Sequence, residues 1–347
     1  MEKERLQHID IAKGLCILLV VVGHILQYNF SGTGSSSAFN FIYSFHMPLF
    51  MLLSGYVAAL STKKIDFQIG FGFVKRKFYS LAIPFFVWGL FITPFIIRQE
   101  NLADFFSIAK RLVTDPNSGA WFIIVLFFIQ LYFLVFRIVT QKISMQKVFV
   151  GECISFAVVL GLLCLTSTVV GRCEDFLSCG GVRQYISIRY FICFMMGYFY
   201  QRYMQGIIFN KWILFAALLL FPLAVKHFVF GKSPLYLQLA VSVCASIIIF
   251  NLSKIIERTA CLHCNKALDW LVMIGKKSLV IYLTHFAVIT VIPADVVVTD
   301  HVKAIPLFLF CSLVSVPIAM LCVKWGELIA TCPVIDFLMY GHKNTKR

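Results

Sequence analysis

The chain has 347 residues, of which 60% are hydrophobic and 14% are charged, whereas an ordinary soluble domain is about 45–50% apolar and about 25% charged. The excess extends along the whole chain, which excludes a soluble enzyme, a disordered protein, a coiled coil and a soluble domain with one anchor. Alternating segments of about 10 residues do not recur, so a transmembrane β-barrel is excluded too. The composition predicts an all-α polytopic membrane protein.

A helix needs about 20 mostly apolar residues to cross a bilayer, and ten segments of the chain approach or exceed this length. They lie near Ile9–Gln27, Asn40–Leu60, Tyr79–Ile97, Ala120–Phe136, Val148–Val170, Tyr185–Tyr203, Trp212–Phe230, Leu235–Leu252, Leu279–Val298 and Ala304–Ile329. No A-x-A-like cleavage site follows the first segment, so we expect an uncleaved span rather than a signal peptide. We expect residues 1–347 to form one bundle of about ten transmembrane helices, without a separate soluble domain.

The net charge of +15 is compatible in principle with a nucleic-acid partner. The basic residues, however, gather in the short connections between apolar segments, where Lys and Arg determine membrane topology. Ten spans place both termini on one side of the membrane, and the excess of basic residues marks that side as the cytoplasm. We therefore expect two cytoplasmic termini and no nucleic-acid partner.

The first span contains three ionisable residues, Asp10, Lys13 and His24, and ionisable groups inside a bilayer are functional candidates by default. Lys13 and His24 are eleven positions apart, which places them about 20° apart around a helix and about 16 Å apart along it. An equally simple explanation for Lys13 is an interfacial lysine that snorkels to the cytoplasmic surface. For His24, the structural alternative is a hydrogen bond to a neighbouring helix.

The spacing also predicts that His24 and His46 lie at one depth. His24 follows Ile9 by fifteen positions, about 22 Å into a hydrocarbon core about 30 Å thick. His46 follows Asn40 by six positions, about 9 Å below the outer surface. We therefore expect a shared polar site in the outer half of the membrane, where imidazoles that titrate near neutral pH are suited to acid–base chemistry.

Two basic clusters lie on the inner side. Lys75, Arg76 and Lys77 precede the third span, and Lys276 and Lys277 precede the ninth. Such clusters usually determine topology or bind anionic lipid, but they are also suited to the phosphates of a nucleotide. Both interpretations remain open from the residues alone.

His285 lies about two turns after Lys277, in the run SLVIYLTHF, and is expected nearer the cytoplasm than His24. A structural role and a functional role are equally open for it, because a single buried histidine often only satisfies a neighbour. Cys261 and Cys264 have the spacing of half a zinc site. Since a structural zinc ion requires four ligands, no metal is expected.

Five stretches of this sequence strongly resemble the acyltransferase-3 family, and within it the branch related to fucose 4-O-acetylase. They are HIDIAKGLCILLVVVGH, FIYSFHMPLFMLLSGY, FVKRKFYSLAIPFFVWG, AWFIIVLF and IGKKSLVIYLTHF. The resemblance implies a membrane-bound O-acetyltransferase of the bacterial inner membrane. Its expected donor is acetyl-CoA, a substrate rather than a bound cofactor, and its expected acceptor is a hydroxyl of a cell-surface polysaccharide or its lipid-linked precursor. Polysaccharide-biosynthesis proteins are possible partners.

The resemblance also implies which residues bind the donor. The family has a basic residue in its first span, followed after ten intervening residues by a histidine, and Lys13 and His24 occupy these places. Lys13 is the expected phosphate ligand together with Lys75, Arg76 and Lys77. The family more often has Arg than Lys at the first of these positions, and only Arg provides a bidentate fork for phosphate.

The same resemblance assigns the chemical step. A sugar hydroxyl is a poor nucleophile and needs a base, so His24 is the expected general base, or alternatively a transient acyl carrier. His46 is expected to orient His24 or to act on the acyl carbonyl. Asp10 and His285 are candidates for a further polar site.

Two other functions are compatible with a polytopic chain that has buried charges. A transporter or flippase for a glycan or small solute is one, although paired interrupted repeats, which are frequent in transporters, are not recognisable in this sequence. A non-catalytic partner in a polysaccharide synthase complex is the other. The intact motif histidines favour the enzyme.

Overall fold

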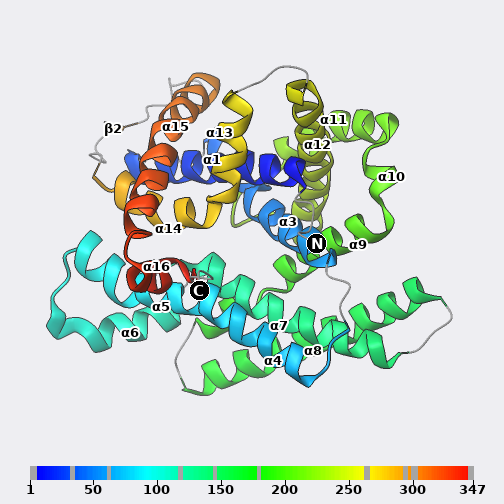
Figure 1. The fold of residues 1–347 in the computed structure, drawn as a ribbon, viewed down its shortest axis with the longest axis horizontal. Helices are drawn as coiled ribbons and strands as arrows, with labels where there is room; N and C mark the ends of the chain where they lie inside the picture. The colour runs from blue at the N-terminus through cyan, green and yellow to red at the C-terminus, as the bar shows by residue number, and fades with distance from the viewer. Residues whose placement is uncertain are drawn as a thin grey trace. The chain divides into compact units, whose positions relative to one another are not determined.

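The computed structural model describes residues 6–31, 36–60, 64–115, 120–143, 147–177, 181–261, 266–291, 296–297 and 304–342. These residues form helices joined by short connections, which confirms the all-α class (Figure 1). Contacts divide the chain into two compact units. The first comprises Met1–Leu60 and Cys193–Glu327, and the second comprises Ser61–Ile192 and Leu328–Arg347.

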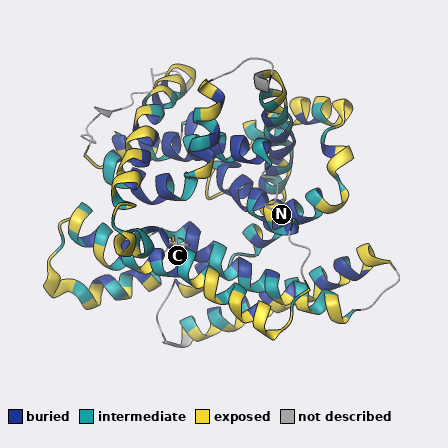
Figure 2. Ribbon diagram, in the orientation of Figure 1, coloured by how far each residue is buried: buried dark blue, intermediate teal, exposed yellow. Residues whose placement is uncertain are grey.

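The first unit is built around its N-terminal helix. Its elements are α1 (Gln7–Asn29), β1 (Phe30–Ser31), α2 (Ser37–Tyr43), α3 (His46–Ala59), most of α9 (Ile188–Tyr203), α10 (Gln205–Ile208), α11 (Lys211–Lys226), α12 (Leu235–Cys261), α13 (Lys266–Lys276), α14 (Ser278–Ile289), β2 (Val296–Val297) and most of α15 (Ala304–Ile329). Helix α1 packs against α3, α12, α13 and α14. In an apolar stretch of 18 residues in α1, 72% is buried inside the protein, whereas the buried share of the corresponding stretches of α12 and α15 is 33% each (Figure 2). The two short strands pair in parallel.

Two glycines allow the backbones of α1 and α13 to approach closely. A Cβ atom on Gly14 would lie 2.5 Å from the carbonyl oxygen of Leu271, and one on Gly275 would overlap the carbonyl oxygen of Asp10. Ile11 of α1 is buried beside this crossing with Leu268 and Val272 of α13. Because no larger residue fits at either glycine, the crossing fixes how α1 and α13 are aligned.

A sharp bend follows the crossing. Helices α13 and α14 meet at Lys277 with an angle of 84° between them. Helix α14 then runs along α1, and the Nδ2 atom of Asn29 donates a hydrogen bond to the carbonyl oxygen of Ile289 over 3.2 Å. Through this bend, α13 and α14 pack against different stretches of the same central helix.

Seven helical segments in the described part of the chain are long and apolar enough to cross a membrane, or eight if the bent pair α13–α14 is one span. The seven are Gln7–Asn29, Ser37–Ala59, Phe67–Ile97, Trp121–Lys142, Val148–Asp175, Leu235–Thr259 and Ile305–Ile329. The other expected spans coincide with shorter helices: α9 and α11 have 16 residues each and α14 has 12. The count of ten and the cytoplasmic termini remain predictions.

The second unit contains one long helical run with π-helical stretches. It comprises α4 (Phe67–Lys77), η2 (Phe78–Ala82), α5 (Ile83–Val87) and η3 (Trp88–Ile97). The unit's other elements are η4 (Leu102–Asp104), α6 (Phe105–Thr114), α7 (Trp121–Lys142), α8 (Val148–Leu177), η6 (Val182–Tyr185), the start of α9 and α16 (Pro333–Tyr340). The indole Nε1 of Trp88 donates a hydrogen bond to the carbonyl oxygen of Met339 over 2.9 Å, which ties α16 to the long run.

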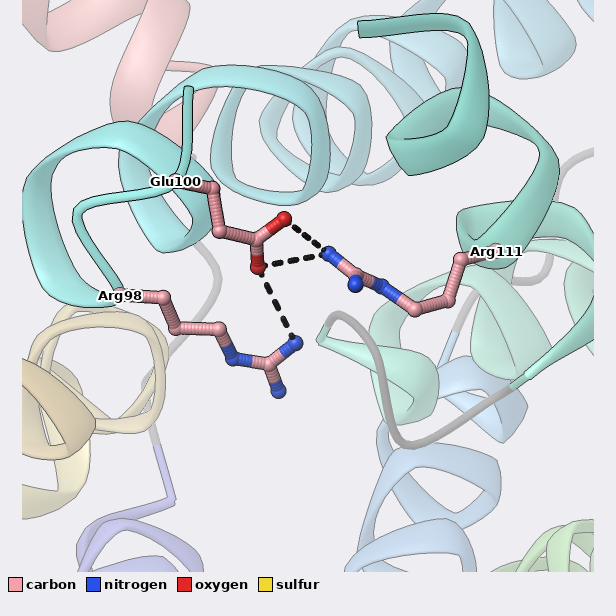
Figure 3. Close-up of polar contacts among 3 residues, drawn as sticks. All are labelled: Arg98, Glu100 and Arg111. Atoms are coloured by element: carbon pink, nitrogen blue, oxygen red, sulfur yellow. Dashed lines mark hydrogen bonds and ion pairs between the residues drawn. The ribbon is translucent and has the colours of Figure 1, made fainter. Parts of the chain in front are cut away.

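An ion cluster joins the end of this run to α6 (Figure 3). The Arg111 guanidinium donates from one Nη2 atom to both carboxylate oxygens of Glu100, at 2.6 and 2.5 Å, and Arg98 lies 3.9 Å from the same carboxylate. The next residue of α6, Leu112, packs against Gly89 of η3. Exposed ion pairs contribute about 0–1 kcal/mol each, so we assign this cluster to holding the α6 connection in place.

Close packing of α3 on α9 makes Gly55 sensitive to substitution. A Cβ atom at Gly55 would overlap the carbonyl oxygen of Phe194, whereas a Cβ atom at Gly161 of α8 would meet nothing within 4 Å. We expect Gly55→Ala to destabilise the protein by about 1–3 kcal/mol through overpacking. Gly161→Ala is the matched control and should be neutral or slightly stabilising, because alanine favours a helix over glycine. Thermal unfolding of the detergent-solubilised protein measures both, and equal midpoints would contradict the prediction.

Candidate active site

Two histidines from distant parts of the chain are hydrogen-bonded to each other in the first unit. The Nδ1 atom of His24 on α1 lies 2.6 Å from the Nε2 atom of His285 on α14. The two rings are nearly parallel, 8° apart, with centroids 4.9 Å apart. His285 is 2% exposed, and His24 is half-buried. The more accessible ring is therefore held by the less accessible one.

The direction of this hydrogen bond follows from the other nitrogen of His285. Its Nδ1 atom lies 2.9 Å from the carbonyl oxygen of Ile281, which can only accept. A neutral imidazole has one N–H, so Nε2 of His285 must accept, and Nδ1 of His24 must donate to it. The remaining nitrogen of His24, Nε2, then carries a lone pair. His24 is thus held in the tautomer that a general base requires.

The glycine crossing explains why these histidines meet. His24 lies ten positions after Gly14, and His285 lies ten positions after Gly275. Since α1 and α14 run side by side from that crossing, their side chains reach the same level. The sequence placed His285 nearer the cytoplasm than His24, and this expectation was wrong, because counting residues from a span's start ignores the bend before α14.

His46 lies near this pair but does not hydrogen-bond to His24. Its Nδ1 atom donates to the carbonyl oxygen of Ile42 over 2.7 Å, and its own carbonyl oxygen accepts from the Cys16 thiol over 3.2 Å. The ring packs on Tyr43 at 4.8 Å and is within electrostatic range of His24. His46 was expected to orient His24, but the hydrogen bond that orients the His24 ring is made with His285.

Asp10 and Lys13 lie at the opposite end of α1. They precede His24 by fourteen and eleven positions, about 21 and 16 Å along the helix. Asp10 is 3% exposed and Lys13 is half-buried. Asp10 therefore does not join His285 in one polar site. The turn that contains Lys13 packs on Gly275, directly before the basic pair at the α13–α14 bend.

The other expected donor ligands belong to the second unit. Lys75, Arg76 and Lys77 form the last turn of α4, and the first two are exposed. Lys75 lies over the ring of Tyr79 at 6.0 Å, and the other two lie over Phe73 at 5.9 and 5.6 Å. The ring of Tyr79, two positions after the cluster, thus supports the ammonium group of Lys75.

Four side chains near His24 were not singled out from the sequence. Gln27 and Tyr28 follow it by one turn on α1, Tyr43 lies on α2, and Phe286 follows His285 on α14. The Tyr28 ring lies 5.9 Å from the His24 ring and 4.7 Å from that of Phe286. The Tyr43 hydroxyl donates to the Gln27 side-chain oxygen over 2.6 Å. The signal in the sequence was the i+3 and i+4 spacing from His24, which puts Gln27 and Tyr28 on its face.

Metal ligands do not gather in the part of the chain that the structure describes: no three His, Cys, Asp or Glu side chains there are placed to hold an ion. Of the zinc half-site, Cys264 and the side chain of Cys261 lie outside the described residues.

The sequence profile of the acyltransferase domain matches residues 6–324, which include both units' main helices. The chain therefore belongs to the acyltransferase-3 family. Together with the fold, this defines a multi-pass membrane protein of an acyltransferase class. The match does not distinguish the fucose 4-O-acetylase branch, which remains a prediction.

Two curated relatives are nodulation proteins. The chain is 34% identical over 139 residues to the nodulation protein NolL of Mesorhizobium japonicum, a stretch of 38% of this chain and 35% of that protein. It is 29% identical over 174 residues to NolL of Sinorhizobium fredii, covering 46% and 43%. The similarity thus spans less than half the length of these relatives. No solved structure matches the chain.

Proposed function

We propose that the protein is a membrane-bound O-acetyltransferase that transfers an acetyl group from acetyl-CoA to a hydroxyl of a cell-surface polysaccharide or its lipid-linked precursor. The family supports acyl transfer. The observation that carries the proposal is the His24–His285 hydrogen bond, which leaves a basic nitrogen on a half-buried ring. The sequence motifs described above support acetyl-CoA as the donor and a glycan as the acceptor.

In this proposal His24 is the general base. Its Nε2 atom accepts the proton of the acceptor hydroxyl as that oxygen attacks the thioester carbonyl of acetyl-CoA. The carbon–sulfur bond then breaks, and the departing sulfur takes the proton from Nε2. The products are an acetyl ester and CoA with a free thiol. His285 accepts the Nδ1–H bond throughout, and this bond strengthens when His24 becomes positively charged.

His46 has a supporting role in the same proposal. Because its Nδ1–H is bonded to the carbonyl of Ile42, the neutral ring presents an acceptor at Nε2. It is therefore suited to accept a hydrogen bond from a second acceptor hydroxyl and not to polarise the acyl carbonyl. Asp10 has no part in the chemical step.

The phosphates of the donor are proposed to bind at the N-terminal end of α1, near Lys13. The sequence resemblance separately makes Lys75, Arg76 and Lys77 of the second unit candidate phosphate ligands. The thioester then reaches His24 through the pantetheine arm, which must extend along about 16 Å of α1. We place the protein in the bacterial inner membrane with both termini cytoplasmic, where acetyl-CoA is available. Proteins of polysaccharide biosynthesis are the proposed partners.

Donor binding tests the basic cluster. We expect neutralisation of Lys75, Arg76 and Lys77 to Gln to weaken CoA binding about tenfold, since each partly screened phosphate contact is worth about 0.2–1 kcal/mol. The salt dependence of Kd should also decrease. Titration of the purified protein with CoA at two salt concentrations measures both effects. Neutralising Lys142 and Lys147, two exposed lysines of the same unit, is the control. Unchanged binding in the triple variant would reassign the cluster to lipid and topology.

A transfer assay tests the proposed function itself. Membranes that contain the protein are incubated with acetyl-labelled acetyl-CoA and chemically de-O-acetylated surface polysaccharide. We expect label in the polysaccharide as an alkali-labile ester, and none with membranes that lack the protein. Equal incorporation in both membranes would rule the proposal out.

A further inference from the structure

We propose that Gln27, Tyr28, Tyr43 and Phe286 form the subsite that binds the sugar ring of the acceptor. We call these four residues the aromatic rim. The inference rests on the proposed function and adds to it the residues that recognise the acceptor. No part of the proposed chemical step uses them.

Two members of the aromatic rim, Tyr28 and Phe286, contact the His24 ring. Tyr28 is 37% exposed and packs against both His24 and Phe286. Phe286 in turn lies 6.4 Å from the His24 ring, edge to face. On the other side, the ring of Tyr43 touches Gly23, the residue before His24: a Cβ atom there would lie 3.1 Å from it. Two aromatic rings therefore contact the catalytic candidate His24, and a third, from α2, packs on the residue before it.

The chemistry of the aromatic rim is suited to a carbohydrate. A pyranose has an apolar C–H face and a periphery of hydroxyls, so its sites combine aromatic faces with a few polar groups. Tyr28 and Phe286 provide the rings. Gln27 is exposed, and its side-chain oxygen is already bonded to the Tyr43 hydroxyl. That bond orients the amide so that its NH₂ group is available to donate to sugar hydroxyls.

The position of the aromatic rim is compatible with simultaneous binding of the donor. Lys13 lies about 16 Å from His24 toward the N-terminus of α1, whereas Gln27 and Tyr28 lie one turn beyond His24 in the opposite direction. The phosphates of the donor and the ring of the acceptor thus approach His24 from opposite ends of one helix. Direct transfer requires both substrates at His24 together, and this arrangement allows it.

The competing explanation is that these aromatic residues only anchor the protein at the membrane surface, where tyrosines are frequent. Tyr236 offers a matched control. It is 76% exposed in the first turn of α12, in the same unit, and within the described residues it has no ring contact with the histidines. Loss of anchoring should affect Tyr28 and Tyr236 variants alike, whereas loss of a sugar subsite should affect Tyr28 variants alone.

The experiment measures steady-state transfer from acetyl-CoA to de-O-acetylated surface polysaccharide by the full-length protein in vesicles. For Tyr28→Ala we expect the acceptor KM to rise at least tenfold, with kcat and the donor KM within about twofold of wild type. Tyr28→Phe should restore the acceptor KM to within threefold, because the ring is kept. Gln27→Leu should raise it about fivefold, and Tyr236→Ala should leave all three constants unchanged.

Three results would overturn the subsite. The first is an equal effect of Tyr28→Ala and Tyr236→Ala, which would indicate anchoring. The second is a rise in the donor KM instead of the acceptor KM in Tyr28→Ala, which would assign the rim to the pantetheine arm. The third is an acceptor KM that Tyr28→Ala leaves unaltered. The proposed function fails differently: wild-type protein then transfers no acetyl group to the polysaccharide, and the inference fails with it.

Discussion

Replacing His24 by Gln is expected to lower acetyl transfer by about 10²–10⁴-fold, the usual contribution of a general base. Gln preserves a donor toward His285 but cannot accept a proton at neutral pH, so the variant separates basicity from hydrogen bonding. The measurement is the acetyl content of the isolated polysaccharide, normalised to the amount of protein in the membrane. His24→Ala should be at least as damaging.

His227→Gln provides the matched control. His227 is an exposed histidine of the same unit at the end of α11, and its replacement should leave acetylation unchanged. Thermal unfolding of each detergent-solubilised variant shows whether the fold is intact. Near-wild-type acetylation by the His24→Gln protein would make His24 structural, and the base would then have to be sought at His46 or His285.

Replacing His285 by Leu is expected to reduce transfer about 10–100-fold through its effect on His24. The Nδ1–H group of His24 loses its acceptor, and a lost buried hydrogen bond costs about 1–3 kcal/mol, while each 1.4 kcal/mol corresponds to tenfold in rate. The ring is then free to adopt the tautomer with its lone pair on the wrong nitrogen. His285 acts as a positioning residue in this account.

His285→Gln distinguishes positioning from simple packing. The Gln amide oxygen can accept from His24 while its NH₂ group donates to the carbonyl of Ile281, which preserves the chain of hydrogen bonds. We expect this variant to retain transfer within about tenfold of wild type. Kinetic constants of both variants, each with verified membrane insertion, provide the comparison. Equal losses in His285→Leu and His285→Gln would contradict the tautomer argument.

The sequence by itself determined the class of this protein and singled out His24, His46 and His285 as candidate site residues. The apolar fraction and the long apolar segments required a helical membrane protein, because unpaired backbone groups are not tolerated in hydrocarbon. The relative positions of Lys13 and His24 on α1 were predictable because they depend only on the spacing of two residues within one helix. For the same reason, the i+3 and i+4 neighbours Gln27 and Tyr28 were recognisable in principle, although they were not singled out.

Only the tertiary structure decided which histidines meet. His24 and His285 are 261 positions apart, and their contact depends on the close approach at Gly14 and Gly275 and on the 84° bend that follows. Spans treated as independent rods of equal depth pointed to His46 as the partner of His24. Such a treatment contains no information on how far one helix is shifted or bent relative to another. The relative position of two helices is determined by interlocking side chains and backbone contacts.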